Sequence, residues 1–146
     1  MPQAWLSLGA NLGRPADQLK DAVRRLKARR DIRVTASSTI IITPPWGKTD
    51  QDEFHNMAVA VETDLSPQDL LDACLSIEEA MGRKRNEKWG PRLIDIDLIA
   101  YEKLVIDTKG LTLPHPYAHE RDFVLRPLRE IAPRVADWIE ARDRSG

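Results

Sequence analysis

Alternating apolar and polar positions predict several β-strands along the chain. Residues 3–9 alternate well enough for a first strand. Residues 32–42 are rich in β-branched side chains and predict a second. Residues 56–63 predict a third, and the apolar run within residues 89–99 predicts a fourth.

Apolar residues spaced three to four apart predict helices between these strands. Residues 17–30 carry one such stripe. A second helix is predicted after Ser66 and Pro67, because serine is a favoured N-cap and proline fits the first turn. Gly82 is its predicted stop signal. The tail that begins near residue 124 is predicted to be helical as well.

The predicted order β-α-β-β-α-β is that of the ferredoxin-like fold. We therefore expect an α+β protein with a mostly antiparallel sheet, packed helices, an extra hairpin and C-terminal helices. The hairpin is expected where a turn at residues 101–103 leads into a short partner strand at residues 104–107. Neither repeats nor a linker divides the chain, so residues 1–146 are expected to form one domain.

Composition narrows the class of protein. The 146 residues are 42% apolar and 31% charged, which favours a soluble globular protein. The net charge of −1 gives no general basic character, so neither nucleic acid nor a membrane surface is an expected partner. A single cysteine, Cys74, excludes an internal disulfide framework. Without a signal-peptide pattern or about 20 consecutive apolar residues, we expect a cytoplasmic protein.

Two carboxylates, Asp95 and Asp97, interrupt the fourth predicted strand. Residues two apart in a strand point the same way, so both aspartates share one face, opposite Ile94, Ile96 and Leu98. Two carboxylates at this spacing suit Mg²⁺, which completes its shell with water and phosphate. The alternative is a solvated polar face at a sheet edge, and an Asp-x-Asp pattern alone favours that alternative.

Basic residues on both sides of the aspartates strengthen the metal–phosphate hypothesis. They are Arg83, Lys84, Arg85, Lys88 and Arg92 upstream, and His115, His119, Arg121 and Arg126 downstream. Arginine binds phosphate with bidentate geometry, and such a cluster suits a nucleoside triphosphate. Each arginine taken singly is better explained by a solvated surface role, and charge alone leaves both interpretations open. Gly9 and Gly13 fit no familiar phosphate motif, and they indicate a turn first and a ligand-binding loop second.

Six stretches together resemble the 6-hydroxymethyl-7,8-dihydropterin pyrophosphokinase family. They run in order from residue 7 to about residue 133: SLGANLG (7–13), TPPWG (43–47), FHN (54–56), GRKR (82–85), WGPRLIDIDLI (89–99) and LPHPYAHERDFVLRPL (113–128). The WGPR-x-x-D-x-D string is the most specific of them.

The resemblance implies an enzyme of folate biosynthesis, a magnesium-dependent pyrophosphokinase. Such an enzyme transfers the pyrophosphate of ATP to the hydroxymethyl group of the pterin and releases AMP. Its implied cofactor is a pair of Mg²⁺ ions, held by Asp95 and Asp97, with ATP as co-substrate. The two small molecules are the implied partners, and we expect a monomer. No side chain is an obvious general base, which fits catalysis by metals and alignment.

The resemblance also assigns roles to individual residues. Catalysis is expected from Asp95, Asp97, Arg85 and Arg92. The expected pterin-binding residues are Thr43, Pro44, Trp46, Phe54, Asn56 and Phe123, with the two phenylalanines stacking on the ring. The expected ATP-binding residues are Glu78, Arg83, Arg85, Lys88, Trp89, Arg92, Leu98, His115 and Arg121. From sequence alone, core packing explains Phe123 better, and a solvated helix position explains Glu78 better.

The sequence departs from the pattern of the family at four places, one of them a pair of residues. Leu75 stands where relatives often have glutamine, and Lys88 replaces a frequent arginine. Lys109-Gly110 stands where arginine is common, and Pro116 where an aromatic residue is frequent. These departures are expected to affect ATP affinity more than the type of reaction.

Two other classes of function compete with this interpretation. One is a different Mg²⁺-dependent phosphoryl or nucleotidyl transferase, which the products of the reaction would distinguish. The other is a ferredoxin-like binding module for RNA or a small ligand, because the fold alone does not decide function. A single-stranded RNA binder would need aromatic residues on its sheet, whereas only 5% of this chain is aromatic, mostly in predicted loops.

Overall fold

The computed structural model describes residues 1–43, 53–82 and 94–145 of the chain. The strands of these ranges are β1 (Gln3–Ala10), β2 (Arg33–Ser37), β3 (Ile41–Thr43), β4 (Phe54–Glu62), β5 (Asp95–Tyr101), β6 (Ile106–Asp107) and β7 (Thr112–Leu113). The helices are α1 (Pro15–Ala28), α2 (Pro67–Ala80), the 3₁₀ turn η1 (Ala118–Glu120), α3 (Asp122–Ile131) and α4 (Pro133–Ser145).

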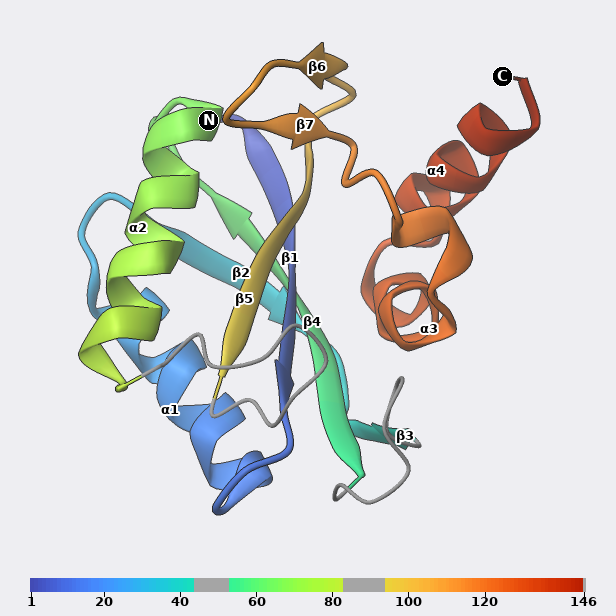
Figure 1. The fold of residues 1–146 in the computed structure, drawn as a ribbon. Coiled ribbons are helices and arrows are strands. Elements are labelled where there is room, and N and C mark those ends of the chain that lie inside the picture. The colour runs from blue at the N-terminus through green and yellow to red at the C-terminus, as the bar shows by residue number, and fades with distance from the viewer. Residues whose placement is uncertain (44–52, 83–93, 146) are drawn as a thin grey trace.

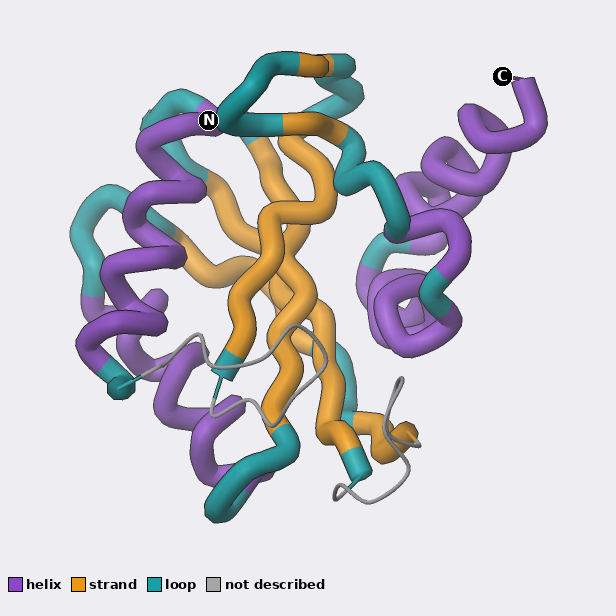
Figure 2. The backbone as a smooth tube through the Cα atoms, in the orientation of Figure 1, coloured by secondary structure: helices purple, strands orange, loops and turns teal. Residues whose placement is uncertain are grey.

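The main sheet has the strand order β2-β4-β1-β5, and every neighbouring pair is antiparallel. Figure 2 shows the strands in orange, between the purple helices. With α1 and α2 as the crossover helices, this order confirms the predicted ferredoxin-like arrangement. β2 and β5 are the outer strands in this order, so β5 forms one edge of the sheet that the structure describes.

The prediction of a single strand over residues 32–42 was wrong in one respect, because the structure has two strands there, β2 and β3. Both strands pair with β4, but Ser38 interrupts the ladder between them. The backbone N–H of Ser38 donates to Ala58 O, and Ser38 Oγ accepts from Ala58 N at 2.8 Å. A side-chain oxygen thus replaces a carbonyl in the ladder, which is a known way for serine to compete with regular structure.

Helices cover both faces of the sheet, α1 and α2 on one side and α3 and α4 on the other (Figure 1). The side with α1 and α2 buries the larger residues of the central strands, including Leu6, Leu8 and Val59. The side with α3 and α4 has small residues on β4, Ala58 and Ala60, which allow α3 to pack closely. Alternation along each strand therefore divides the core in two.

The second helix begins and ends as the sequence predicts. Ser66 Oγ accepts from the N–H of Asp69 at 3.1 Å, and Pro67 is the first helical residue. Gly82 follows the helix with φ +88°, a conformation that favours glycine at a helix end.

The extra hairpin exists, but its pairing differs from the prediction. The predicted partner strand at 104–107 shortens to β6, which pairs with β7 rather than with β5. Leu113 of β7 is almost fully buried in the larger core, so burial of this side chain holds the hairpin on the sheet.

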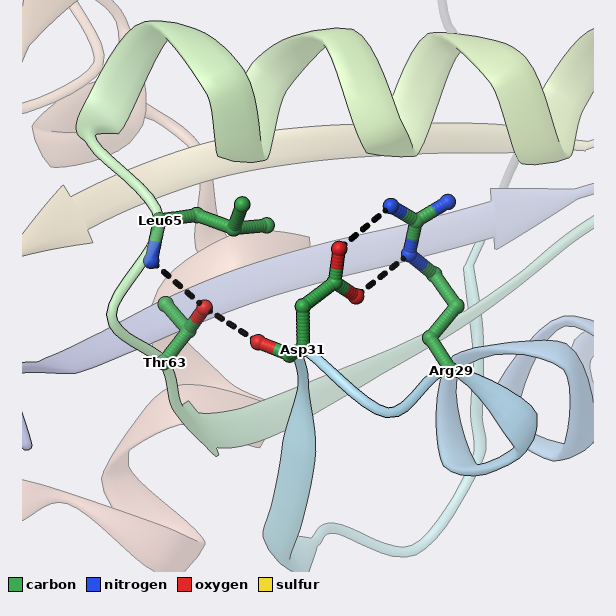
Figure 3. Close-up of polar contacts among 4 residues, drawn as sticks. All are labelled: Arg29, Asp31, Thr63 and Leu65. Carbon is green, nitrogen blue, oxygen red and sulfur yellow. Dashed lines mark hydrogen bonds and ion pairs between the residues drawn. The ribbon is translucent and has the colours of Figure 1, made fainter.

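A network of polar contacts joins two connections at the end of the sheet where β4 finishes (Figure 3). Arg29 makes a bidentate ion pair with Asp31, at 2.9 and 2.8 Å. Thr63 Oγ1 donates to the carbonyl of Asp31 at 2.5 Å and accepts from Leu65 N at 3.1 Å. The fully buried Thr63 thereby ties the α1–β2 connection to the β4–α2 connection.

Candidate active site

The two aspartates lie at the start of β5, and their predicted arrangement is confirmed. Asp95 and Asp97 are half-buried and alternate with Ile96 and Leu98, whose side chains are buried in the larger core. Across the sheet, Asp95 pairs with Gly9 of β1 and Asp97 with Ser7. The carboxylates therefore lie on the sheet face that α3 and α4 cover.

A row of three paired residues crosses the sheet at this end. Gly9 pairs with Asp95 on one side and with Asn56 of β4 on the other. Asn56 is 4% exposed, and its Nδ2 donates to Thr43 Oγ1 at 2.9 Å. The row thus places a carboxylate and an oriented amide on either side of a glycine.

Gly9 lies between two residues of the candidate site, a position that the sequence did not predict. A Cβ atom at this position would lie 2.9 Å from Asn56 Oδ1, a distance that real Cβ contacts do not show. The interpretation of Gly9 and Gly13 as a turn fits only Gly13, which has φ +68°. The signal in the sequence was the glycine at the end of an otherwise regular strand, which indicates a close approach.

The phenylalanines predicted to stack on the pterin come from two different elements. Phe54 begins β4 and lies two residues before Asn56, so both share a face of the sheet. Phe123 is in the first turn of α3, half-buried against the smaller core. The guanidinium carbon of Arg121 lies 5.7 Å from the centre of the Phe123 ring and 5.4 Å from that of Tyr117. This arrangement is a cation–π contact that restrains Arg121.

His115 lies beside the outer edge of β5. Its backbone N–H donates to Ile99 O at 2.8 Å, and its Nδ1 accepts from Tyr117 N at 3.2 Å. Burial, and secondly the positive charge of Arg121, lower the pKa of His115 to about 4. The imidazole is therefore neutral at pH 7, and the contact at Nδ1 assigns its proton to Nε2.

Glu78 of α2 is not the solvated helix carboxylate that sequence alone favours. It is 4% exposed, and its Oε2 accepts from the backbone N–H of Ile96 at 2.6 Å. Burial, and the negative charges of Glu78 and Asp97, raise the pKa of the neighbouring Cys74 thiol to about 12. Cys74 is therefore a protonated core residue at neutral pH.

Seven of the predicted site residues lie outside the described ranges. They are Pro44, Trp46, Arg83, Arg85, Lys88, Trp89 and Arg92. The described residues that the fold gathers at the same end of the sheet are Thr43, Phe54, Asn56, Asp95 and Asp97. The roles assigned to Leu98, Glu78 and the other nucleotide-binding residues stay predictions.

The chemistry of the carboxylate pair fits Mg²⁺. Among the described residues, no group of three or more His, Cys, Asp or Glu side chains could hold a metal by itself. Mg²⁺ does not require such a group, because it commonly binds one or two carboxylates and fills its shell with water and substrate phosphate. Asp95 and Asp97, half-buried on one face, supply that donor set.

Solved structures show which class of fold this is. The chain resembles the crystal structure of Plasmodium falciparum wild-type HPPK-DHPS with SDX-DHP, with a TM-score of 0.70 and 18% identity, over 91% of this chain and 40% of that one. The same protein with pteroate gives a TM-score of 0.71 and 17% identity, over 88% and 38%. The chain thus spans about two fifths of these longer proteins and shares its fold with part of them.

Sequence comparison then identifies the family. Residues 5–133 match the family described as 7,8-dihydro-6-hydroxymethylpterin-pyrophosphokinase (HPPK). A 2-amino-4-hydroxy-6-hydroxymethyldihydropteridine pyrophosphokinase of Methylorubrum extorquens is 54% identical over 91% of this chain and 84% of its own length. A protein of the same name from Bacillus subtilis is 42% identical over 90% and 79%. The chain belongs to the HPPK family, which confirms the resemblance seen in its sequence.

No helix among the described residues combines the length and the apolar character that crossing a bilayer requires.

Proposed function

We propose that this protein transfers pyrophosphate from ATP to 6-hydroxymethyl-7,8-dihydropterin, in folate biosynthesis. The hydroxymethyl oxygen attacks the β-phosphorus of ATP, and a new O–P bond forms. The bond between that phosphorus and the oxygen bridging it to the α-phosphate breaks, so AMP leaves and the hydroxyl proton is released. Membership of the HPPK family supports this reaction. The row of Asp95, Gly9 and Asn56 is the structural observation that supports it best, because it sets a carboxylate for phosphate chemistry beside an amide for a heterocycle.

Asp95 and Asp97 are the residues that would hold two Mg²⁺ ions. When bound, Mg²⁺ would neutralise phosphate charge and lower the pKa of the attacking hydroxyl. The chain itself contributes the fixed spacing of the two carboxylates on a paired strand, which Ser7 and Gly9 support from β1. Such preorganisation matters because phosphoryl transfer depends mainly on positioning and charge stabilisation.

The pterin is proposed to lie over the start of β4. Asn56 is buried and already oriented by its hydrogen bond to Thr43, so its amide can pair with a polar ring edge at little entropic cost. Phe54 and Phe123 are proposed to complete the pocket, together with Pro44 and Trp46, which precede β4 in the sequence. Two aromatic faces suit a flat heterocycle.

ATP is proposed to lie along the outer edge of β5. At this edge the N–H of Ile96 donates a hydrogen bond to Glu78 Oε2. Further along the same edge, the N–H of His115 donates to the carbonyl of Ile99. By alternation, the backbone of Leu98 faces the same edge between these contacts, where it can bind adenine. The neutral imidazole of His115 and the guanidinium of Arg121 are proposed to donate hydrogen bonds to ATP. The other proposed ATP-binding residues are Arg83, Arg85, Lys88, Trp89 and Arg92.

The products of the reaction test the proposal. The purified protein is incubated with MgATP and 6-hydroxymethyl-7,8-dihydropterin, and nucleotides and pterins are separated by chromatography. We expect AMP and pterin diphosphate in equal amounts. A matched control, 6-methyl-7,8-dihydropterin, lacks the attacking hydroxyl and should give no AMP. Formation of ADP with pterin monophosphate, or release of free pyrophosphate, would identify a different transferase and contradict the proposal.

A further inference from the structure

The outer edge of β5 has a buried carboxylate where an edge strand usually meets solvent. Ile96 lies opposite Leu8 of β1, but its own N–H points away from β1 and donates to Glu78 Oε2 at 2.6 Å. Glu78 comes from the last turns of α2 and is 4% exposed. α2 therefore packs on β5 and also satisfies a main-chain donor of that strand.

Burying a carboxylate is unfavourable unless strong hydrogen bonds compensate for the lost water. A carboxylate that accepts a backbone N–H makes a short, charge-assisted hydrogen bond, and the 2.6 Å distance fits that description. Removing the acceptor would leave the N–H of Ile96 buried and unsatisfied. The contact is thus a strong local restraint on one peptide group of β5.

That peptide group lies between the two aspartates. The orientation of this peptide is set by ψ of Asp95 and φ of Ile96. It therefore affects the direction of the Cα–Cβ bonds of the residues on either side of Ile96, which are Asp95 and Asp97. Because β5 is an edge strand, hydrogen bonds to β1 hold it from one side only. Glu78 supplies a restraint on the other side, where no strand among the described residues pairs with β5; a second contact, from the His115 N–H, lies further along at Ile99.

We propose that Glu78 is a positioning residue, which fixes the directions of Asp95 and Asp97 by accepting the hydrogen bond from the Ile96 N–H. The inference rests on the proposed function, since it assigns Asp95 and Asp97 to metal-bound phosphate. It differs from a direct ATP contact, because the effect passes through the backbone of β5. It also differs from a general electrostatic effect, because it depends on the reach of the side chain.

Two conservative variants separate these roles. Glu78→Gln keeps the length of the side chain and an acceptor oxygen but removes the charge. Glu78→Asp keeps the charge, but its carboxylate is one methylene too short to reach Ile96. The exposed neighbour Glu79 provides the control variant Glu79→Gln, which changes the helix charge equally.

Amide hydrogen exchange, measured by NMR on the protein without ligands, tests the restraint itself. The Ile96 amide should exchange at least tenfold faster in Glu78→Asp than in the wild type, and only a few-fold faster in Glu78→Gln. Exchange at Ile96 that is unchanged in Glu78→Asp would overturn the proposal. This readout does not depend on any reaction, so it stands or falls separately from the proposed function.

Calorimetric titration with Mg²⁺ and α,β-methylene-ATP, together with kinetics, tests the consequence. Glu78→Asp should raise the Mg²⁺ concentration for half-saturation about tenfold and lower kcat by a similar factor. Glu78→Gln should stay within about threefold of the wild type, and Glu79→Gln should be unchanged. If Glu78→Asp performs as well as Glu78→Gln, the reach of the side chain to the Ile96 N–H does not matter, and the proposal fails; if Glu78→Asp performs better, the charge matters instead, and the proposal also fails. A rise in the KM for ATP alone, with the Mg²⁺ dependence unchanged, would instead indicate direct nucleotide contact.

Discussion

At the scale of single residues, the geometry of the candidate site depends on a glycine, which has no side chain to fill the space beside Asn56. Gly9 is paired on both sides, with Asp95 and with Asn56, and the space that its Cβ would fill is taken by Asn56 Oδ1. The lack of a Cβ at Gly9 leaves room for Asn56 Oδ1 there, while Asn56 Nδ2 donates to Thr43 Oγ1. An orientation fixed before binding lowers the entropy lost on binding a ligand.

The variant Gly9→Ala tests this role. The new Cβ would lie 2.9 Å from Asn56 Oδ1, so the amide must move and its hydrogen bond to Thr43 must weaken. We expect the KM for the pterin to rise about tenfold, which is about 1.4 kcal/mol, while the KM for ATP stays within about twofold. Steady-state kinetics with each substrate varied in turn measures both constants.

A double variant provides the control for this prediction. In an Asn56→Ala background the clashing oxygen is gone, so Gly9→Ala should add little further loss. Additive losses in the double variant would show that Gly9 acts on something other than Asn56.

At the scale of elements, the sequence predicted those helix and strand boundaries that depend only on residues within the same segment. The helix after Ser66 could be predicted because its cap, its first-turn proline and its stop glycine are local signals. The division of residues 32–42 could not, because it depends on Ser38 meeting Ala58 across the sheet. The burial of Glu78 was missed for the same reason, since its partner Ile96 lies 18 residues further along the chain.

The connection between α1 and β2 supplies an element-scale prediction. Thr63→Val removes a fully buried hydroxyl that donates to Asp31 O and accepts from Leu65 N. Leaving these groups unsatisfied should lower the free energy of unfolding by about 1–3 kcal/mol. Asp31→Asn, which breaks only the partly exposed pair with Arg29, should lower it by about 1 kcal/mol or less. Urea unfolding of both variants measures the difference, and equal losses would contradict this assignment.

At the scale of the whole molecule, the candidate site and a stabilising polar network lie at opposite ends of the sheet. Its register brings Asp95, Gly9 and Asn56 together at one end, while the contacts of Thr63 are beyond the opposite end of β4. α1 and α2 cover one face of the sheet (Figure 1), and the larger core lies on that face. By strand alternation, the carboxylates face the other side. The shared face of Asp95 and Asp97 could be predicted from strand alternation, but their nearness to Asn56 could not. That nearness is set by the pairing of three strands, which a pattern within one strand does not specify.

The most direct test of the account is the effect of removing one charge from the carboxylate pair. Asp95→Asn and Asp97→Asn keep side-chain shape, so each variant is expected to stay folded, which thermal unfolding measures. AMP formation from MgATP and the pterin should fall by about 100-fold or more in each variant, because phosphate charge is no longer balanced. AMP formation near the wild-type rate in either variant, measured at saturating Mg²⁺, would contradict the central claim that this pair carries the reaction.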